Sequence, residues 1–282
     1  MRTSAADADT VIARLLATAK YRPIHPDTIA DVVHQEAAHA TDKSDLERRS
    51  RGKLHKVVGG YLLSGRSARL LRGMDEDALR DPARLREECL SVLGAHFSSA
   101  ERLPDLARFY PTVFGLTGIP RTIADIACAL NPFSLPWLRD VTGACYVGYD
   151  LNRTYTELGQ TFFARAYPDC DVQYRDVLVE PQAIVADVAL LLKTYHSIED
   201  RRAGAGLRLV EDLGTNHVVI SFPVKAMHGR IARFPLRHIA ELKALAELKG
   251  WGFQQAALPT ENLVAVTKGS DTEGPGASEV GP

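Results

Sequence analysis

The sequence has 282 residues, of which 45% are hydrophobic and 24% are charged, and its formal net charge is -1. These values fit a folded protein with a substantial core and exclude a chain that is disordered throughout. A net charge near zero excludes attraction of nucleic acid by an overall positive field, so an RNA-binding surface must come from local clusters of Lys and Arg. The four cysteines include no Cys-x-x-Cys pair, and we expect no metal site and no disulfide framework.

The first residues contain no apolar run that is typical of a signal peptide. The longest apolar stretch, residues 185–192, is far too short to span a bilayer. We therefore expect a cytoplasmic protein with no membrane partner.

The first hundred residues predict helices only. Apolar residues recur at helical spacing along stretches that begin near residues 11, 29, 46, 85 and 103. Two of the starts are marked by proline at the first helical position, in Pro26-Asp27 and in Asp81-Pro82. We assign residues 1–104 to an N-terminal all-helical domain.

Strands and helices alternate from Gly118 onward. Strands are predicted over residues 122–127, 145–149, 172–174, 187–192 and 217–222, and a closing hairpin over 253–257 and 263–266. Helices are predicted from about residue 134 and over 154–167, 198–213 and 239–248. This alternation predicts an α/β fold with a Rossmann-like, doubly wound and mostly parallel sheet over residues 105–268. The tail, residues 269–282, is rich in Gly, Ser, Glu and Pro and is expected to be disordered.

Acidic residues stand within or after the first three predicted strands, at Asp125, Asp150 and Asp176. Ligands of a doubly wound sheet bind at the carboxyl ends of the strands, where a carboxylate can accept both hydroxyl hydrogen bonds of a ribose. Asp150 has the position expected for that role, and Asp176 is placed to hold an adenine amino group. The alternative is that each acid only caps the helix that follows it.

The first strand is followed by Ala127-Cys128-Ala129-Leu130-Asn131-Pro132 and not by Gly-x-Gly-x-x-Gly. Those glycines let a backbone approach a pyrophosphate, so their absence argues against NAD and FAD. S-adenosylmethionine has no phosphate, and small residues suffice beside its methionine part. An α/β domain without any nucleoside ligand stays open as the alternative.

The fourth strand ends at Leu192-Lys193-Thr194-Tyr195, where many methyltransferases of exocyclic amines carry Asn/Asp-Pro-Pro-aromatic. A ring nitrogen already presents a lone pair and needs no such motif, so the ending is consistent with a ring-nitrogen target. Lys193 is a functional candidate because a lysine that emerges from an apolar strand is costly unless its amine meets a partner or water.

Two basic clusters are candidates for RNA binding. Arg49, Lys53 and Lys56 fall on one face of a predicted helix, and Lys225 and Arg230 belong to a second cluster. Both clusters can neutralise phosphates. A solvated helix face is the ordinary alternative for any single charge run.

These features resemble the aminoglycoside-resistance 16S rRNA methyltransferases that modify N7 of guanine-1405 in the decoding site. The resemblance covers most of the chain. It is carried by Gly59-Gly60-Tyr61, His96-Phe97-Ser98-Ser99-Ala100-Glu101-Arg102-Leu103, Asp125-Ile126-Ala127-Cys128-Ala129-Leu130-Asn131-Pro132, Gly148-Tyr149-Asp150, Asp176-Val177-Leu178, Leu192-Lys193 and Ser221-Phe222-Pro223-Val224-Lys225.

The resemblance implies an S-adenosylmethionine-dependent enzyme that acts on 16S rRNA within the 30S subunit, and we expect a monomer. It makes the N-terminal helical domain the RNA-docking part. It matches Arg102 to an arginine that pairs with the cofactor carboxylate. Lys193 and Arg230 match basic residues that are needed for activity by positioning or electrostatics, and no general base is assigned. The other implied cofactor-binding residues are Tyr61, His96, Phe97, Ser98, Ala127, Asp150, Asp176, Val177, Leu192 and Arg201.

The chain also departs from the family pattern. Ile231–Leu236 replaces the stretch that usually follows Gly-Arg, Ala129 replaces a glycine, and Arg201 stands where a polar or acidic residue is expected. Two other functions therefore stay open. One is an S-adenosylmethionine-dependent methyltransferase with another RNA or a small-molecule target, and the other is a non-catalytic RNA-binding protein on the same fold.

Overall fold

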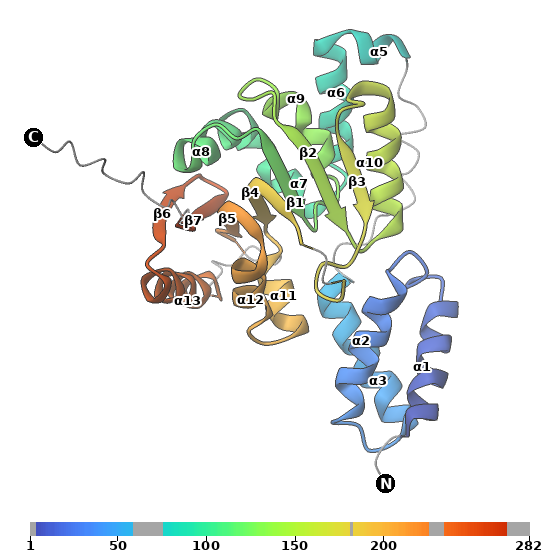
Figure 1. Cartoon of the computed structure of the whole chain (residues 1–282). Helices are drawn as coiled ribbons and strands as arrows, with labels where there is room; N and C mark the ends of the chain where they lie inside the picture. Colours follow the sequence, from blue (N-terminus) through green and yellow to red (C-terminus); the bar gives the residue numbers. More distant parts are fainter. Residues whose placement is uncertain (1–3, 59–75, 181–182, 226–233, 270–282) are drawn as a thin grey trace, which may run out of the picture.

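The structure is a computed structural model that describes residues 4–58, 76–180, 183–225 and 234–269. It contains one mixed sheet, helices on both faces of that sheet, and a separate group of helices at the amino-terminal end (Figure 1). The strands are β1 (Thr122–Ile126), β2 (Cys145–Asp150), β3 (Asp171–Tyr174), β4 (Val185–Leu192), β5 (Gly214–Pro223), β6 (Gly252–Ala257) and β7 (Glu261–Thr267).

The sheet has the strand order β3-β2-β1-β4-β5-β7-β6. The five strands from β3 to β5 are parallel, and β7 and β6 close the sheet as the predicted antiparallel hairpin. The strand order reverses between β1 and β4, so the switch point that favours ligand binding lies at the carboxyl ends of these two strands. The predicted doubly wound α/β sheet is therefore present.

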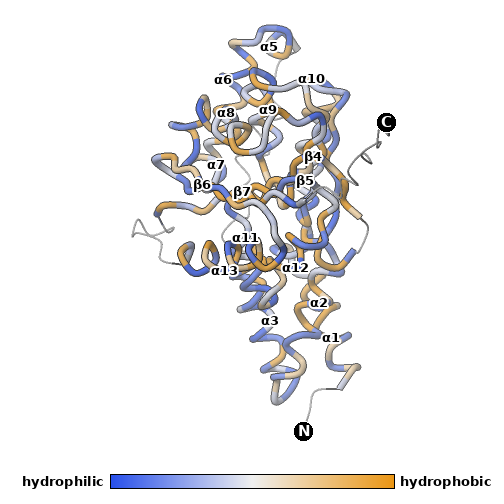
Figure 2. Tube along the Cα trace, turned by 60° about the vertical axis from the view of Figure 1, so that its left-hand side comes forward, coloured by the Kyte–Doolittle hydropathy of each residue, from blue (hydrophilic) through white to orange (hydrophobic). Residues whose placement is uncertain are grey.

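Alternate side chains of the central strand β4 enter two different cores. Val188 and Leu190 face the core that includes helices before and after β1, whereas Ala189 and Leu191 face the core of the opposite side. Burial on both faces explains why this strand reads as a continuous apolar run. Figure 2 shows hydrophobic strands of the sheet in the middle of the molecule, whereas α3, in the amino-terminal part, is mostly hydrophilic.

Two groups of helices cover the sheet. On one side lie α5 (Glu76–Arg80), α6 (Pro82–Leu93), α7 (Phe97–Arg102), α8 (Leu106–Thr117), α9 (Leu135–Leu138) and α10 (Arg153–Ala166), with the short 3-10 turns η2 (Leu103–Asp105) and η3 (Asn131–Ser134). On the other side lie α11 (Tyr195–Arg201), α12 (Ala205–Asp212) and α13 (Phe234–Lys249). The single helix predicted over residues 198–213 is wrong, because Gly204 adopts a φ of +75° and separates α11 from α12.

The remaining helices form what we call the N-terminal bundle: α1 (Ala5–Ala17), α2 (Pro26–Ala37) and α3 (Lys43–Val58). The bundle has its own apolar core, which includes Val11, Leu15, Ile29 and Leu46. Main-chain atoms anchor it to the sheet. Ile24 forms an antiparallel bridge with Asn152, the His25 amide donates to the Leu151 carbonyl at 2.8 Å, and the Arg153 amide donates to the Pro23 carbonyl at 2.7 Å.

The predicted boundary at residue 104 stays a prediction. Within the described residues, α6 packs with η3 and α9 in the core on one face of the sheet, whereas the bundle core is separate. Most of the predicted disordered tail lies outside the described residues. Among the helices that the structure describes, none has the length and apolar character needed to span a bilayer.

Candidate cofactor-binding site

An open cavity that encloses about 870 Å³, its solvent-filled mouth included, lies at the carboxyl ends of β1, β2 and β4, between the sheet and the N-terminal bundle. The arrowheads of β2 and β3 in Figure 1 point towards the bundle. The bundle supplies apolar wall residues, Ile24, Val57 and Val58. The cavity is therefore built by segments that are far apart in the sequence.

Most of the residues predicted to bind the cofactor line this cavity. They are His96, Ser98, Ala127, Asp150, Asp176, Val177, Leu192 and Arg201, together with the predicted catalytic residue Lys193. Phe97 and Arg102 are not among the lining residues. Tyr61 and Arg230 lie outside the described residues.

Asp150 ends β2 and is 6% exposed. Its carboxylate accepts hydrogen bonds from the Ala129 amide at 2.9 Å and from the Asn152 amide at 2.8 Å. Burial raises the pKa of Asp150 to about 7, and the two amides oppose that rise. A carboxylate with two oxygens held by backbone amides still has lone pairs for the hydroxyl groups of a ribose.

The turn after β1 is left-handed at two alanines. Ala127 has a φ of 54° and Ala129 a φ of 45°, a region that costs an L-residue about 1–2 kcal/mol. The geometry directs the Ala129 amide to Asp150. Strain of this kind is common where a backbone must approach a ligand closely.

Asp125 does not line the cavity. It is 1% exposed and lies beneath the turn, where it accepts hydrogen bonds from Asn131 at 2.6 Å and from the Tyr146 hydroxyl at 2.5 Å. Burial raises the pKa of Asp125 to about 6, although both hydrogen bonds favour its ionised form. Its contacts give it a structural role in fixing the turn, whereas Asp150 and Asp176 line the cavity.

Arg102 lies behind the cavity wall. Its guanidinium donates to both oxygens of Glu261, at 2.7 and 2.9 Å, and to the Asn131 side chain at 3.1 Å. Burial favours neutral Glu261, but the charges of Arg102 and Lys193 hold the pKa of that carboxyl below its ordinary value. Sequence reasoning missed Glu261. The available signal was a single acid at the start of an apolar strand, since a buried charge requires a partner.

Lys193 follows β4 with a φ of 57°, and its side chain is 3% exposed. Its ammonium donates to the Ser98 carbonyl at 3.1 Å and to Glu101 at 2.9 Å, and lies 3.5 Å from Glu261. The Lys193 ammonium, predicted to need a partner, therefore finds its partners in Ser98 and Glu101 of α7 and Glu261 of β7. Burial lowers the pKa of the neighbouring His96 to about 4, so this imidazole is neutral near pH 7.

The four described candidates for RNA binding have different surroundings. Arg49 and Lys53 both pair with Glu36, at 2.9 and 3.3 Å, and are half-buried. Lys56 and Lys225 are exposed. The predicted basic face of α3 is therefore partly neutralised from within the bundle.

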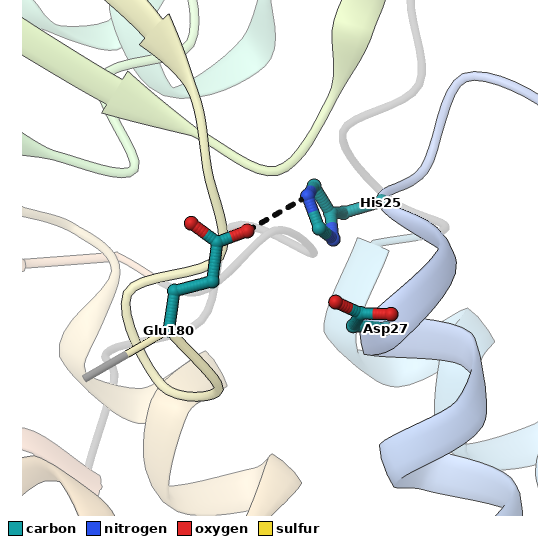
Figure 3. A group of neighbouring side chains, drawn as sticks. All are labelled: His25, Asp27 and Glu180. Atoms are coloured by element: carbon teal, nitrogen blue, oxygen red, sulfur yellow. Dashed lines mark ion pairs between the residues drawn. The ribbon is translucent and has the colours of Figure 1, made fainter. Parts of the chain in front are cut away.

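A further polar group lies at the junction of the bundle with the segment after β3 (Figure 3). His25 approaches Glu180 with its Nε2 atom 3.1 Å from Oε1, and Asp27 lies beside the same ring. One ring nitrogen of His25 and one carboxylate oxygen each of Asp27 and Glu180 lie within 4.8 Å of one another. The observed ion pair gives this group a role in holding the junction.

The comparison with known proteins decides the family. Residues 17–266 match the ribosomal RNA methyltransferase family FmrO. The chain belongs to this family. A 16S rRNA (guanine(1405)-N(7))-methyltransferase of Frankia casuarinae is 30% identical over 258 residues, which cover 88% of this chain and 89% of that protein. The family relationship predicted from the motifs is thereby confirmed.

Solved structures of 16S rRNA methyltransferases show the same fold. The 16S rRNA methylase RmtB is 25% identical, with a TM-score of 0.74 over 93% of this chain and 98% of that one. The methyltransferase RmtF, solved with S-adenosyl-L-homocysteine, is 23% identical and has a TM-score of 0.77 over the same shares. These matches confirm the predicted fold class, including the helical part before the sheet.

Proposed function

We propose that this protein transfers a methyl group from S-adenosylmethionine to N7 of guanine-1405 of 16S rRNA, in the 30S subunit, and so gives aminoglycoside resistance. The observation that carries the proposal is the cavity at the switch point, where Asp150, Asp176 and Lys193 meet in a chain of this family. The related Frankia protein is named for the same reaction. We also assign the protein to the cytoplasm, as a monomer.

The residues present fit the cofactor. The cavity is lined by apolar side chains together with a few polar and charged groups, as is typical of small-molecule sites. Asp150 accepts the ribose hydroxyls, Asp176 and Val177 border the adenine, and the small residues of the turn leave room for the methionine part. The remaining proposed cofactor contacts are Tyr61, His96, Phe97, Ser98, Leu192 and Arg201.

Arg102 retains donors for the cofactor carboxylate. A guanidinium has five N–H groups, and Glu261 and Asn131 take three of them. Lys193 lies beside the same Glu261 carboxylate and also pairs with Glu101. Bidentate pairing on the remaining edge of Arg102 matches the geometry of a carboxylate.

The chain contributes orientation more than acid–base chemistry. The bound cofactor supplies an electrophilic methyl group, and N7 carries no proton, so no general base is needed. Lys193 and Arg230 are proposed to position the base and to stabilise charge around it. The apolar bundle residues Val57 and Val58 exclude water from one side of the cavity.

The helical part before the sheet is proposed to dock on the ribosomal RNA. The exposed Lys56 and Lys225 supply phosphate contacts, and Arg49 and Lys53 exchange their contact with Glu36 for phosphates. Residues 1–104 would then serve substrate docking and residues 105–268 cofactor binding.

The test is methyl transfer from labelled cofactor to unmethylated 30S subunits, with the site mapped by chain cleavage at N7-methylguanine. Label at guanine-1405 is expected, and Asp150→Asn is expected to lose it with the same fold. Label at another nucleotide, or on a small molecule only, would overturn the target. Absence of heat with S-adenosylhomocysteine in calorimetry would overturn the reaction and leave a non-catalytic protein.

A further inference from the structure

One side of α2 carries polar residues that all contact the sheet part of the molecule. His25, Thr28 and Asp31 are spaced three apart, so they lie along one face of the helix. Their partners are Glu180, Asp176 and Arg201, respectively. These contacts span the junction between the N-terminal bundle and the cavity.

Arg201 is the centre of this junction. It is 1% exposed, although it is among the largest side chains of the protein. Its Nε and Nη2 atoms donate to one oxygen of Asp31, at 3.0 and 2.8 Å, and its Nη1 atom donates to Asp176 at 2.5 Å. A buried cation requires such partners, so the position of α2 and the position of Asp176 are tied to each other.

Asp176 links the junction to the cavity. Its Oδ2 atom accepts hydrogen bonds from Thr28 of α2 and from Arg201, and its Oδ1 atom accepts one from the Leu178 amide at 3.0 Å. Asp176 and Arg201 both line the cavity. One carboxylate therefore belongs at once to the cavity wall and to the contact with the bundle.

The bundle in turn forms part of the cavity. Ile24 precedes α2, and Val57 and Val58 end α3. A ligand that fills the cavity touches both the sheet and the bundle. Any displacement of α2 would consequently change the wall that the ligand meets.

We infer that Asp31 and Arg201 are positioning residues that couple cofactor binding to RNA docking by holding the bundle against the cavity. The inference rests on the proposed function, because it assigns RNA docking to the bundle. By linkage, a cofactor that favours the docked bundle raises the affinity for RNA by the factor by which RNA raises the affinity for the cofactor.

The first test needs no RNA. S-Adenosylhomocysteine is added to the full chain, and amide hydrogen exchange is followed in residues 26–37 of α2. We expect the ligand to slow exchange there in the unaltered protein but not in Asp31→Asn. Asp31→Asn leaves Arg201 paired with Asp176, so no buried cation is stranded.

Glu47→Gln is the matched control. Asp31 pairs with two arginines, Arg201 and Arg202. Glu47 likewise pairs with two, Arg14 at 3.2 Å and Arg51 at 2.9 Å, but these belong to the bundle as Glu47 does. Slower exchange with ligand is expected in this variant as in the unaltered protein. Equal protection of α2 in Asp31→Asn and Glu47→Gln would overturn the inference.

The second test measures binding to 30S subunits with and without S-adenosylhomocysteine. The ratio of the two affinities is expected to be about 5–150 in the unaltered protein, the usual range of such coupling, and near one in Asp31→Asn. Asp31→Glu restores it, because the longer carboxylate still reaches Arg201. An unchanged ratio in Asp31→Asn overturns the coupling, whereas failure of methylation with coupled binding intact overturns only the proposed reaction.

Discussion

Glu261 holds Arg102 through two parallel hydrogen bonds, Nε to Oε1 at 2.7 Å and Nη2 to Oε2 at 2.9 Å, across 159 positions of the sequence. The pair joins α7 to the first residue of β7. Both side chains are nearly inaccessible, at 6% and 0% exposure. The pair therefore orients a guanidinium beside the cavity and fixes the closing hairpin to α7.

Removal of Glu261 is expected to destabilise the fold strongly. Glu261→Ala leaves Arg102 as an uncompensated buried charge, which costs about 3–5 kcal/mol of unfolding free energy. Glu101→Ala is the control, because Lys193 keeps the Ser98 carbonyl and Glu261 as partners when this quarter-exposed carboxylate is removed. It is expected to cost clearly less than Glu261→Ala. Urea denaturation measures both. Similar losses in the two variants would contradict the role given to Glu261.

The pKa of Asp150, about 7, makes nucleoside binding dependent on pH. Ribose hydroxyls donate to the ionised carboxylate, so the affinity should rise with pH through that pKa, by about tenfold between pH 6 and pH 8. 5′-Methylthioadenosine is the suitable probe, because it lacks the α-amino and α-carboxyl groups of the methionine part of the cofactor. Calorimetry of Asp150→Asn should show weak binding that does not change over this interval. A rise of equal size in that variant would assign the titration to another group.

The same group affects stability in the opposite direction. Because burial raises the pKa of Asp150 from its ordinary 3.8 to about 7, the folded protein binds the proton more tightly than the unfolded chain. Its contribution to stability is therefore fully present below about pH 4 and is lost as pH rises to about 7. The difference in unfolding free energy between the unaltered protein and Asp150→Asn checks this sign.

Much of the fold follows from local pattern. The β4 segment is apolar on both faces, and Asp150 and Asp176 stand at strand ends, so the sheet and the general position of the cavity are predictable. The break at Gly204 is harder to predict, because an isolated glycine in a helical pattern is often tolerated. Its left-handed φ depends on how α11 and α12 pack.

Long-range contacts are the part of the site that sequence pattern does not determine. The role of Glu261 depends on its pairing with Arg102. The role of Arg201 depends in the same way on its pairing with Asp31 and Asp176. The cavity wall from Val57 and Val58 likewise depends on how the bundle meets the sheet. Local spacing carries no information on such pairings, although a buried charge signals that some partner exists.

The left-handed alanines predict a stabilising substitution. Ala129→Gly removes the steric cost of a φ of 45° and should raise the unfolding free energy by about 0.5–1 kcal/mol. Ala164→Gly, at an exposed position inside α10, is the control and should lower it by about 1 kcal/mol. Thermal unfolding distinguishes the two signs. A loss of stability in Ala129→Gly would show that the turn is not strained.

The exposed Lys56 predicts a change in the salt dependence of 30S binding. Lys56→Glu removes one phosphate contact, so the slope of log affinity against log salt should become shallower by about one. Arg165→Glu, near the end of α10 far from the bundle, is the control and should leave the slope unchanged. Filter binding at several salt concentrations gives both slopes. Identical slopes for the two variants would remove Lys56 from the docking surface.

The anchor of the N-terminal bundle is made by main-chain atoms of Pro23, Ile24 and His25 with Leu151, Asn152 and Arg153. Such hydrogen bonds place little demand on side-chain identity, so the helices beyond them can change in sequence while the attachment persists. The segment around Pro23 is accordingly a natural exchange point for chimeras. Helices α1–α3 of a relative could be joined there, with an aspartate kept at the position of Asp31. They would attach to the sheet as the bundle of this protein does, but would present a different surface.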